Sequence, residues 1–92
     1  MLTALKHFAD PDFWFYYRQL PEEIRVLADK NFDLLKSDPR HPSVRLKKVG
    51  SLYSARLGLH YRELAKERSD GLQWFWIGHH STYDRLLRGG ET

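Results

Sequence analysis

The sequence predicts an α+β fold, in which an N-terminal helical hairpin packs on a twisted four-stranded antiparallel sheet and a short C-terminal helix follows. Two observations carry this prediction. Apolar residues recur at helical spacing in the first 37 residues, whereas from residue 44 onward short apolar or alternating runs are separated by turns that contain glycine. Ninety-two residues provide one modest core, so we expect residues 1–92 to form a single domain.

The N-terminal part of the chain contains the signals of two helices. Residues 1–7 have no clear period and form either a short edge strand or a loose arm. Asp10-Pro11 starts a helix, because aspartate can accept a hydrogen bond at the cap and proline suits the first helical position. Pro21-Glu22-Glu23 starts a second helix, and Ser37-Asp38-Pro39 ends it. Leu20-Pro21 is then the corner of the predicted hairpin.

Four strands and a last helix are expected after this hairpin. The strands are predicted over residues 44–49, 52–57, 60–66 and 72–77. The last of them is almost wholly apolar, which is typical of a strand buried on both faces. In a regular strand Trp74 and Trp76 point to one face of the sheet, and Phe75 and Ile77 point to the other. Ser81 can cap a helix that runs through Leu87, with Asp84 as its capping-box partner.

The turn at Gly58 decides which side chains share a face of the sheet. With a two-residue loop, Leu57 pairs with His60 and the side chains of Arg56 and Arg62 lie on opposite faces. With a three-residue loop and a glycine bulge, Leu57 pairs with Tyr61 and Arg56 lies across from Arg62. Facing like charges destabilise a sheet unless an anion lies between them, and guanidinium groups suit phosphate. We therefore favour the three-residue loop.

Composition limits the classes of protein to consider. Residues 40–68 carry eight Lys and Arg side chains against two Glu, so the positive charge is concentrated in the middle third of the chain. Such a stripe suits a phosphate-bearing or acidic partner, although a solvated sheet edge is often basic as well. The absence of cysteine excludes disulfides, thiolate zinc sites and thiol catalysis. With no long apolar run and no secretory signal, we expect a cytoplasmic protein without membrane contact.

The five histidines do not predict a metal site. His7, His41 and His60 lack the helical or turn spacing that metal ligands share, so we expect neither a metal nor a cofactor. His79 and His80 follow the central strand directly. Adjacent strand residues point to opposite faces, so at most one of these two can join a given site.

The order and spacing of several motifs resemble the RelE/ParE superfamily of toxin–antitoxin toxins, specifically its RelE-like branch. These motifs are Leu20-Pro21, Leu46-Lys47-Lys48, Tyr53-x-x-Arg56-x-Gly58, Tyr61-Arg62 and Ile77-Gly78-His79-His80-x-x-Tyr83. The similarity covers about residues 10–88. It implies a toxin of a type II system with a concave basic active face, a part in translation inhibition and plasmid stabilisation, and a cognate antitoxin that wraps and silences it.

The resemblance also implies a reaction and the residues that carry it. RelE-like toxins cut messenger RNA in the ribosomal A site, where the RNA 2′-hydroxyl attacks the adjacent phosphate and the 5′-oxygen leaves. This metal-independent chemistry needs a base, an acid and cations. By position, the catalytic set is Arg56, Arg62, His80 and Tyr83, with Arg62 as the phosphate-stabilising arginine. Arg45, Lys47 and Lys48 lie in the stretch that binds the RNA backbone.

One departure from the family keeps other functions open. Ser54 stands where RelE-like enzymes can carry a lysine, and serine is a poor base. His80 is then the best base, because an imidazole changes charge near neutral pH, and Tyr83 would stack on an RNA base or orient the nucleophile. The alternatives are a ParE-like gyrase poison and an inert antitoxin-binding module. Arg56 and Arg62 could also be structural, paired with Glu63 or Asp84.

Overall fold

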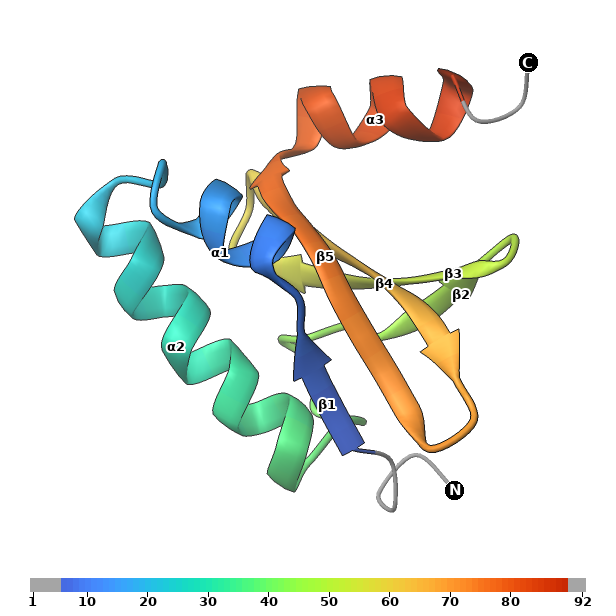
Figure 1. Ribbon diagram of the computed structural model, residues 1–92. Coiled ribbons are helices and arrows are strands. Elements are labelled where there is room, and N and C mark those ends of the chain that lie inside the picture. The colour runs from blue at the N-terminus through green and yellow to red at the C-terminus, as the bar shows by residue number, and fades with distance from the viewer. Residues whose placement is uncertain (1–5, 90–92) are drawn as a thin grey trace.

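The computed structural model describes residues 6–89, and Figure 1 shows their arrangement. In chain order the elements are β1 (Lys6–Ala9), α1 (Pro11–Tyr17), α2 (Glu22–Ser37), β2 (Lys47–Val49), β3 (Leu52–Leu57), β4 (Tyr61–Arg68), β5 (Gly71–His79) and α3 (His80–Gly89). The strands form one sheet in the order β1-β5-β4-β3-β2. β1 runs parallel to β5, and the other neighbouring strands are antiparallel.

The sheet has five strands rather than the predicted four, and it is mixed rather than antiparallel. The additional strand is β1, in which Lys6 pairs with Gly71 and Ala9 pairs with Trp74. Four residues are too few for their alternation to predict a strand, and β1 depends on the edge that β5 offers. Gly71 allows this approach, because a Cβ atom there would collide with the Lys6 carbonyl. Residues 1–5 of the predicted strand or arm lie outside the described residues.

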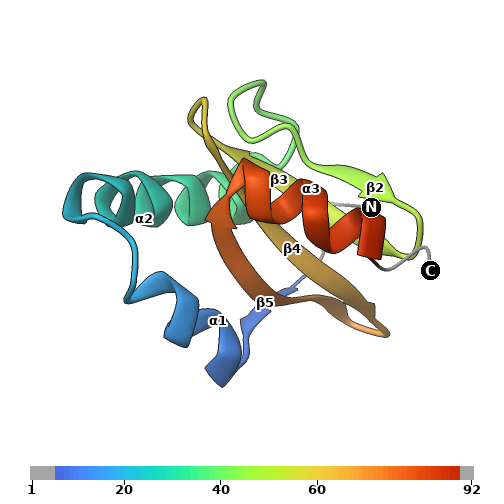
Figure 2. The same ribbon diagram turned by 90° about the horizontal axis from the view of Figure 1, so that it is seen from above.

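The two N-terminal helices begin where the sequence predicts, but a helical hairpin is not confirmed. Asp10 caps α1 by accepting a hydrogen bond from the Phe13 amide at 3.3 Å. α1 is only seven residues long and contacts mainly β5, whereas α2 packs toward β3. Figures 1 and 2 show both helices on the same side of the sheet. Among the described residues, no helix combines the length and apolar character that a membrane span requires.

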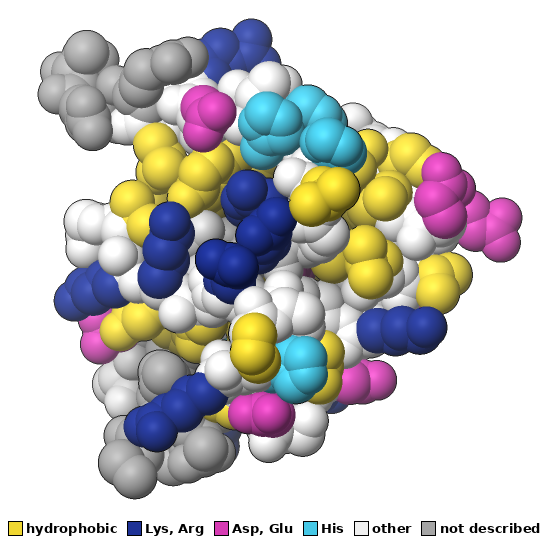
Figure 3. All heavy atoms as spheres, turned by 180° about the vertical axis from the view of Figure 1, so that it is seen from behind, with side chains coloured by type: hydrophobic (Ala, Val, Ile, Leu, Met, Phe, Trp, Pro, Cys, Tyr) yellow, Lys and Arg dark blue, Asp and Glu magenta, His cyan; other side chains and the backbone are white. Residues whose placement is uncertain are grey.

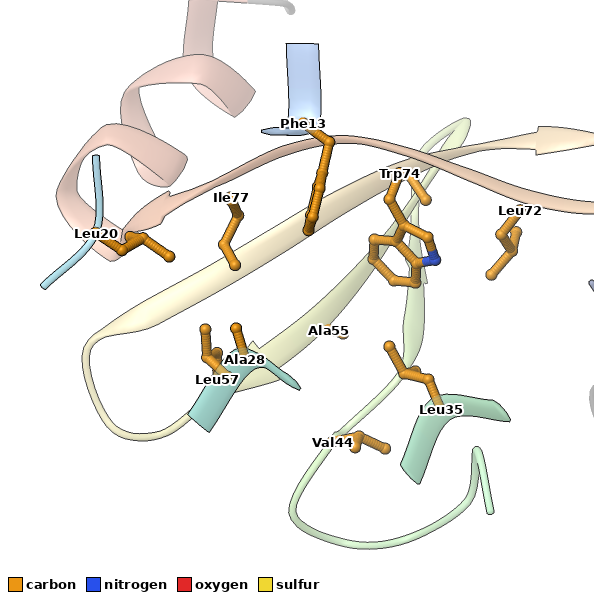
Figure 4. Packing of buried hydrophobic residues seen from close by; sticks show 11 residues of the cluster. Phe13, Leu20, Ala28, Leu35, Val44, Ala55, Leu57, Leu72, Trp74 and Ile77 are labelled. Carbon is orange, nitrogen blue, oxygen red and sulfur yellow. The ribbon is translucent and has the colours of Figure 1, made fainter. Parts of the chain in front are cut away.

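The main core fills the space between the sheet and these two helices. Figure 4 shows how its side chains converge from both layers. It consists of Phe13, Leu20, Ala28, Leu35, Val44, Ala55, Leu57, Ala65, Leu72, Trp74 and Ile77. A second, smaller cluster of Leu64, Trp76 and Tyr83 lies on the other face, where α3 covers part of the sheet. The sheet is therefore buried on one face and only partly covered on the other.

A β-bulge in β5 changes the predicted orientation of its aromatic residues. Leu64 pairs with Trp76 and Ala65 pairs with Trp74, so Phe75 is the extra residue between two paired positions. Trp74 belongs to the main core and Trp76 to the second cluster. The prediction that both tryptophans share one face was wrong, because it assumed a regular strand.

The β3–β4 turn is the three-residue loop that the charge argument favoured. Leu57 pairs with Tyr61, and Arg56 pairs with Arg62. Gly58 has φ +63°, a left-handed conformation that glycine adopts without strain. The register prediction is therefore confirmed.

Two predicted boundaries shift in ways that affect the basic face. The strand expected over residues 44–49 begins only at Lys47, as β2. The reason is that Arg45 has φ +45° and leaves the extended conformation. Val44 is fully buried, and its carbonyl accepts a hydrogen bond from the Arg56 amide at 2.6 Å. α3 begins at His80 rather than after a Ser81 cap, and the His79 ring nitrogen Nδ1 accepts the Ser81 amide at 3.2 Å instead.

Candidate nucleic-acid interface

A basic groove lies on the sheet face opposite α1 and α2. Its volume is about 370 Å³, and its lining residues are Arg45, Leu46, Lys47, Ser54, Arg56 and Arg62. Figure 3 shows Lys and Arg side chains gathered at the centre of this face. Four of the six lining residues are cations, contributed by β2, β3, β4 and the loop before β2.

The centre of the groove is the facing pair of Arg56 and Arg62, which are directly opposite in the β3–β4 register. On the other side of β4, Arg62 pairs with Gly78. Position 78 has no space for a side chain, because a Cβ atom there would lie 2.6 Å from Cζ2 of the Trp76 indole. A side chain at position 78 would therefore displace the Trp76 ring.

Neither arginine forms an ion pair with a carboxylate of residues 6–89. No carboxylate of the described part of the chain lies within 4.0 Å of either group. The structural alternative, pairing with Glu63 or Asp84, was wrong for this reason: Glu63 points to the helix-covered face, and Asp84 lies 3.8 Å from His80. Facing like charges cost stability unless an anion occupies the space between them.

Local hydrogen bonds hold the two guanidinium groups in place. Arg56 Nε donates to the Gly58 carbonyl at 3.0 Å, and Arg62 Nη1 donates to the Tyr61 carbonyl at 2.8 Å. A guanidinium carries five N–H donors, so each arginine retains most of its donors for a ligand. The pair is thus preorganised for an anion with several acceptor oxygens, such as a phosphate.

The structure separates Lys47 from Lys48, although both were predicted to bind RNA. Lys47 lines the groove, whereas Lys48 points to the opposite face. There the Lys48 ammonium lies 6.0 Å from the Tyr53 ring centroid and 3.9 Å from Glu67. The prediction for Lys48 is not supported, because adjacent residues of a strand cannot both reach one face.

Ser54 lies at the floor of the groove and is almost completely buried, with 2% of its surface exposed. Its partner in the β2–β3 register is Lys47. The position at which the sequence resemblance allows a lysine therefore has Lys47 beside it on the neighbouring strand. Arg45 also lines the groove, in agreement with its predicted place in the basic stretch.

His80 lies beyond the end of β5, two residues after Gly78, the residue that pairs with Arg62. Its ring stacks on the ring of His79 with centroids 4.5 Å apart, and both rings stack near His60. The expectation that His79 and His80 point to opposite faces was wrong, because His80 is already the first residue of α3. Figure 3 shows histidine side chains gathered beside the central Lys and Arg side chains.

Tyr83 does not lie in the groove. It belongs to the second hydrophobic cluster with Leu64 and Trp76, and only 8% of its surface is exposed. This placement gives Tyr83 a packing role that holds α3 to the sheet. It does not support the prediction that Tyr83 stacks on an RNA base or orients the nucleophile.

Solved structures identify the fold. A RelB-RelE antitoxin–toxin complex from Methanococcus jannaschii matches at a TM-score of 0.63 and 19% identity, over 85% of this chain and 96% of that one. YafQ from E. coli matches at 0.68 and 9% identity, over 86% and 97%. An arginine-to-alanine double mutant of E. coli toxin RelE, in complex with a RelB antitoxin peptide, matches at 0.60 and 17% identity, over 90% and 94%. This chain has the RelE-like toxin fold.

No family model matches the sequence, and neither does any curated protein. The likeness to the RelE-like structures, at less than 20% identity, concerns the fold. The roles of the groove residues rest on their own geometry.

Glu63 is a buried acid that the sequence pattern did not lead us to predict. Glu63 on β4 has only 1% of its surface exposed, and neither carboxyl oxygen has a hydrogen-bond partner among the described residues. Burial raises the pKa of Glu63 to about 8. Strand alternation contained the signal, because Glu63 stands between Tyr61 and Ala65 on the helix-covered face.

Proposed function

We propose that this chain is the toxin of a type II toxin–antitoxin system and that it cleaves messenger RNA on the ribosome. The observation that carries the proposal is the pair of Arg56 and Arg62, which face each other on the adjacent strands β3 and β4 in a basic groove and have no carboxylate partner among the described residues. Holding two like charges together is costly, and a phosphate diester between them removes the cost. The RelE-like fold supports the same function.

The proposed reaction breaks the RNA backbone by internal attack. The 2′-hydroxyl oxygen forms a bond to the adjacent phosphorus, the bond from phosphorus to the 5′-oxygen breaks, and a cyclic phosphate remains on the upstream fragment. His80 takes the proton of the 2′-hydroxyl. Arg56 and Arg62 stabilise the negative charge that builds up on the phosphate oxygens in the transition state.

Lys47 completes this assignment. Its side chain lines the groove at the register position of Ser54, so an ammonium group is present beside the site where the family can have a lysine. We assign to Lys47 the protonation of the leaving 5′-oxygen. Arg45 then contacts the neighbouring phosphate of the RNA backbone.

The proposed partners are messenger RNA, the ribosome and a cognate antitoxin. Several RelE structures of the same fold were solved as complexes with a RelB antitoxin, which supports an antitoxin partner for this chain. An open reading frame for a small acidic protein beside this gene would agree with that partner.

Induced expression in a bacterium, with primer extension on an abundant translated message, tests the proposal. We expect cuts that appear only while the message is translated. The variant Arg62→Ala should reduce cutting by about 100-fold or more, the scale of losing one charge partner of a transition state. Arg68→Ala is the matched control, because this arginine lies on the same strand but pairs with Asp70 at 3.3 Å. Cutting should be unchanged in this control.

Other outcomes of this experiment would favour one of the alternative functions. Growth arrest with intact message would contradict RNA cleavage and favour a ParE-like action on gyrase. An absence of growth arrest would favour an inert antitoxin-binding module. Equal loss of cutting in Arg62→Ala and Arg68→Ala would make the effect of Arg62 structural.

A further inference from the structure

Three histidines from separate parts of the sequence meet beside the basic groove. His60 lies in the β3–β4 loop, His79 ends β5, and His80 begins α3. One ring nitrogen from each lies within 4.8 Å of the other two. His79 and His60 are exposed and His80 is half-buried, and none of them belongs to a hydrophobic cluster of the described residues.

The main chain holds these three residues together. The β4–β5 register places Tyr61 opposite His79, so the residue before Tyr61 reaches the end of β5. The His80 amide donates a hydrogen bond to the His60 carbonyl at 2.7 Å. The cluster is therefore built on the ends of two paired strands and the start of a helix, and not on free loop tips.

We propose that His60, His79 and His80 bind a divalent transition-metal ion, with water completing its coordination. Imidazole nitrogen is a preferred ligand of Zn²⁺, Ni²⁺ and Cu²⁺, and a site of three histidines with an open position is an established form of zinc coordination. The site adjoins the groove through Gly78, which pairs with Arg62 and precedes His79. It is separate from the Arg56–Arg62 pair but shares His80 with the proposed reaction, so a bound ion would prevent His80 from acting as the base.

The groups around the rings favour this role. In metal sites, the ring nitrogen that does not bind the ion usually faces a carboxylate, a carbonyl or another oxygen. Asp84 Oδ2 lies 3.8 Å from His80 Nδ1, and Ser81 Oγ lies 3.0 Å from His79 Nδ1. The Ser81 amide also donates to His79 Nδ1 at 3.2 Å. Binding of the ion through His79 Nε2 places the ring proton on Nδ1, so this amide contact breaks and Nδ1 donates to the Ser81 hydroxyl oxygen instead.

Binding requires a small movement of the side chains. Zinc–nitrogen bonds of about 2.0–2.1 Å in tetrahedral geometry place ligand nitrogens about 3.3 Å apart. The three rings are now nearly parallel, with interplanar angles of 10–30°, so they must rotate until their lone pairs converge. Their exposure on the surface allows this rotation without repacking the core.

Calorimetric titration of the tag-free, metal-depleted protein with Zn²⁺ tests the proposal. We expect one site, and we expect each of the variants His60→Ala, His79→Ala and His80→Ala to weaken binding by about 100-fold or more, beyond the loss that an outer partner causes. Asp84→Asn should weaken it by about 10-fold to 100-fold. His41→Ala is the matched control, because this histidine lies in the loop before β2 and outside the cluster.

The absorption spectrum of the Co²⁺-loaded protein reports the ligand field independently. Visible bands should be present in the native protein and in His41→Ala and absent from the three cluster variants, with circular dichroism confirming that each variant is folded. Failure of the native protein to bind Zn²⁺ more tightly than the cluster variants would overturn the proposal. Because binding is measured directly, this result is independent of whether the protein cleaves RNA.

Discussion

At the scale of single residues, Glu63 has the most unusual environment in the described chain. Its carboxyl group is buried without a partner between the sheet and the helices, and burial raises its pKa to about 8. The native protein therefore holds this group in its neutral form at neutral pH. A buried ionised carboxylate without a partner would cost several kcal/mol.

This environment predicts a pH-dependent stability. Between the ordinary pKa of 4.5 and about 8, the folded protein keeps a proton on Glu63 that the unfolded chain releases. The free energy of unfolding therefore falls as pH rises through this window, by about 1.4 kcal/mol per pH unit at most. We expect Glu63→Gln to become more stable than the native protein as pH rises from 5 to 8, in urea unfolding at each pH.

Glu67→Gln is the control for this prediction, because Glu67 lies on the same strand with its side chain exposed. Its stability relative to the native protein should change little over the same pH range. If the difference between Glu63→Gln and the native protein is constant with pH, Glu63 is already ionised in the folded state.

At the scale of elements, strand alternation decides which cations can reach a bound RNA. β2 directs Lys47 into the groove and Lys48 to the opposite face. The two residues are neighbours in sequence and have the same chemistry, so they form a natural pair for comparison.

We expect Lys47→Ala to weaken RNA binding and to reduce the salt dependence of that binding. Loss of one phosphate contact changes the slope of log K against log salt by about 0.7 for single-stranded nucleic acid. Lys48→Ala should leave both affinity and slope nearly unchanged. Fluorescence anisotropy with a labelled RNA at several salt concentrations measures both quantities. Equal effects of the two substitutions would place the RNA path outside the groove.

The bulge in β5 is a second property of an element with a testable consequence. Because Phe75 is the extra residue, the positions on either side of it follow regular alternation when it is left out. We expect deletion of Phe75 to preserve the fold, with some loss of stability from its packing against the second cluster. Deletion of Gln73 should prevent folding, because it moves Leu72 to the wrong face relative to Trp74.

Circular dichroism and the dispersion of amide signals in NMR spectra distinguish these two deletions. A folded Gln73 deletion, or an unfolded Phe75 deletion, would contradict the assignment of the bulge.

At the scale of the whole molecule, the two faces of the sheet have different tasks. The face under α1 and α2 contains the main core (Figure 2), and the other face carries the groove, with histidine side chains beside it (Figure 3). On this second face only the smaller cluster of Leu64, Trp76 and Tyr83 is buried, so the rest of the face is available for function. Substitutions outside that cluster can therefore alter activity without unfolding the protein.

Substitution of His80 tests whether activity can be lost on this face while the protein still folds. Its side chain is outside both hydrophobic clusters. We expect His80→Gln to abolish growth arrest while the protein still folds and still binds its antitoxin in a pull-down. His41→Gln should remain toxic. Persistent growth arrest in His80→Gln would exclude this histidine as the base of the proposed reaction.

The starts of the helices and the register between β3 and β4 were predictable from the sequence, because their physical causes are local. The helix starts at Asp10 and Pro21 follow from capping and from the fixed φ of proline. The pairing of Arg56 with Arg62 followed from a charge argument at a single glycine turn. Arg45 and Lys47, which also line the groove, were singled out by the resemblance to RelE-like toxins and not by this pairing.

The tertiary structure decided what depends on contacts between distant segments. β1 exists because the edge of β5 is available to it, and four residues carry no such information. The bulge at Phe75 sends the two tryptophans to opposite faces, although their spacing predicts one face. His60 joins His79 and His80 only because the β4–β5 register and the start of α3 bring three backbone segments to one point. Capping, turns and alternation act over a few residues, whereas strand partners, bulges and clusters are set by how the whole chain packs.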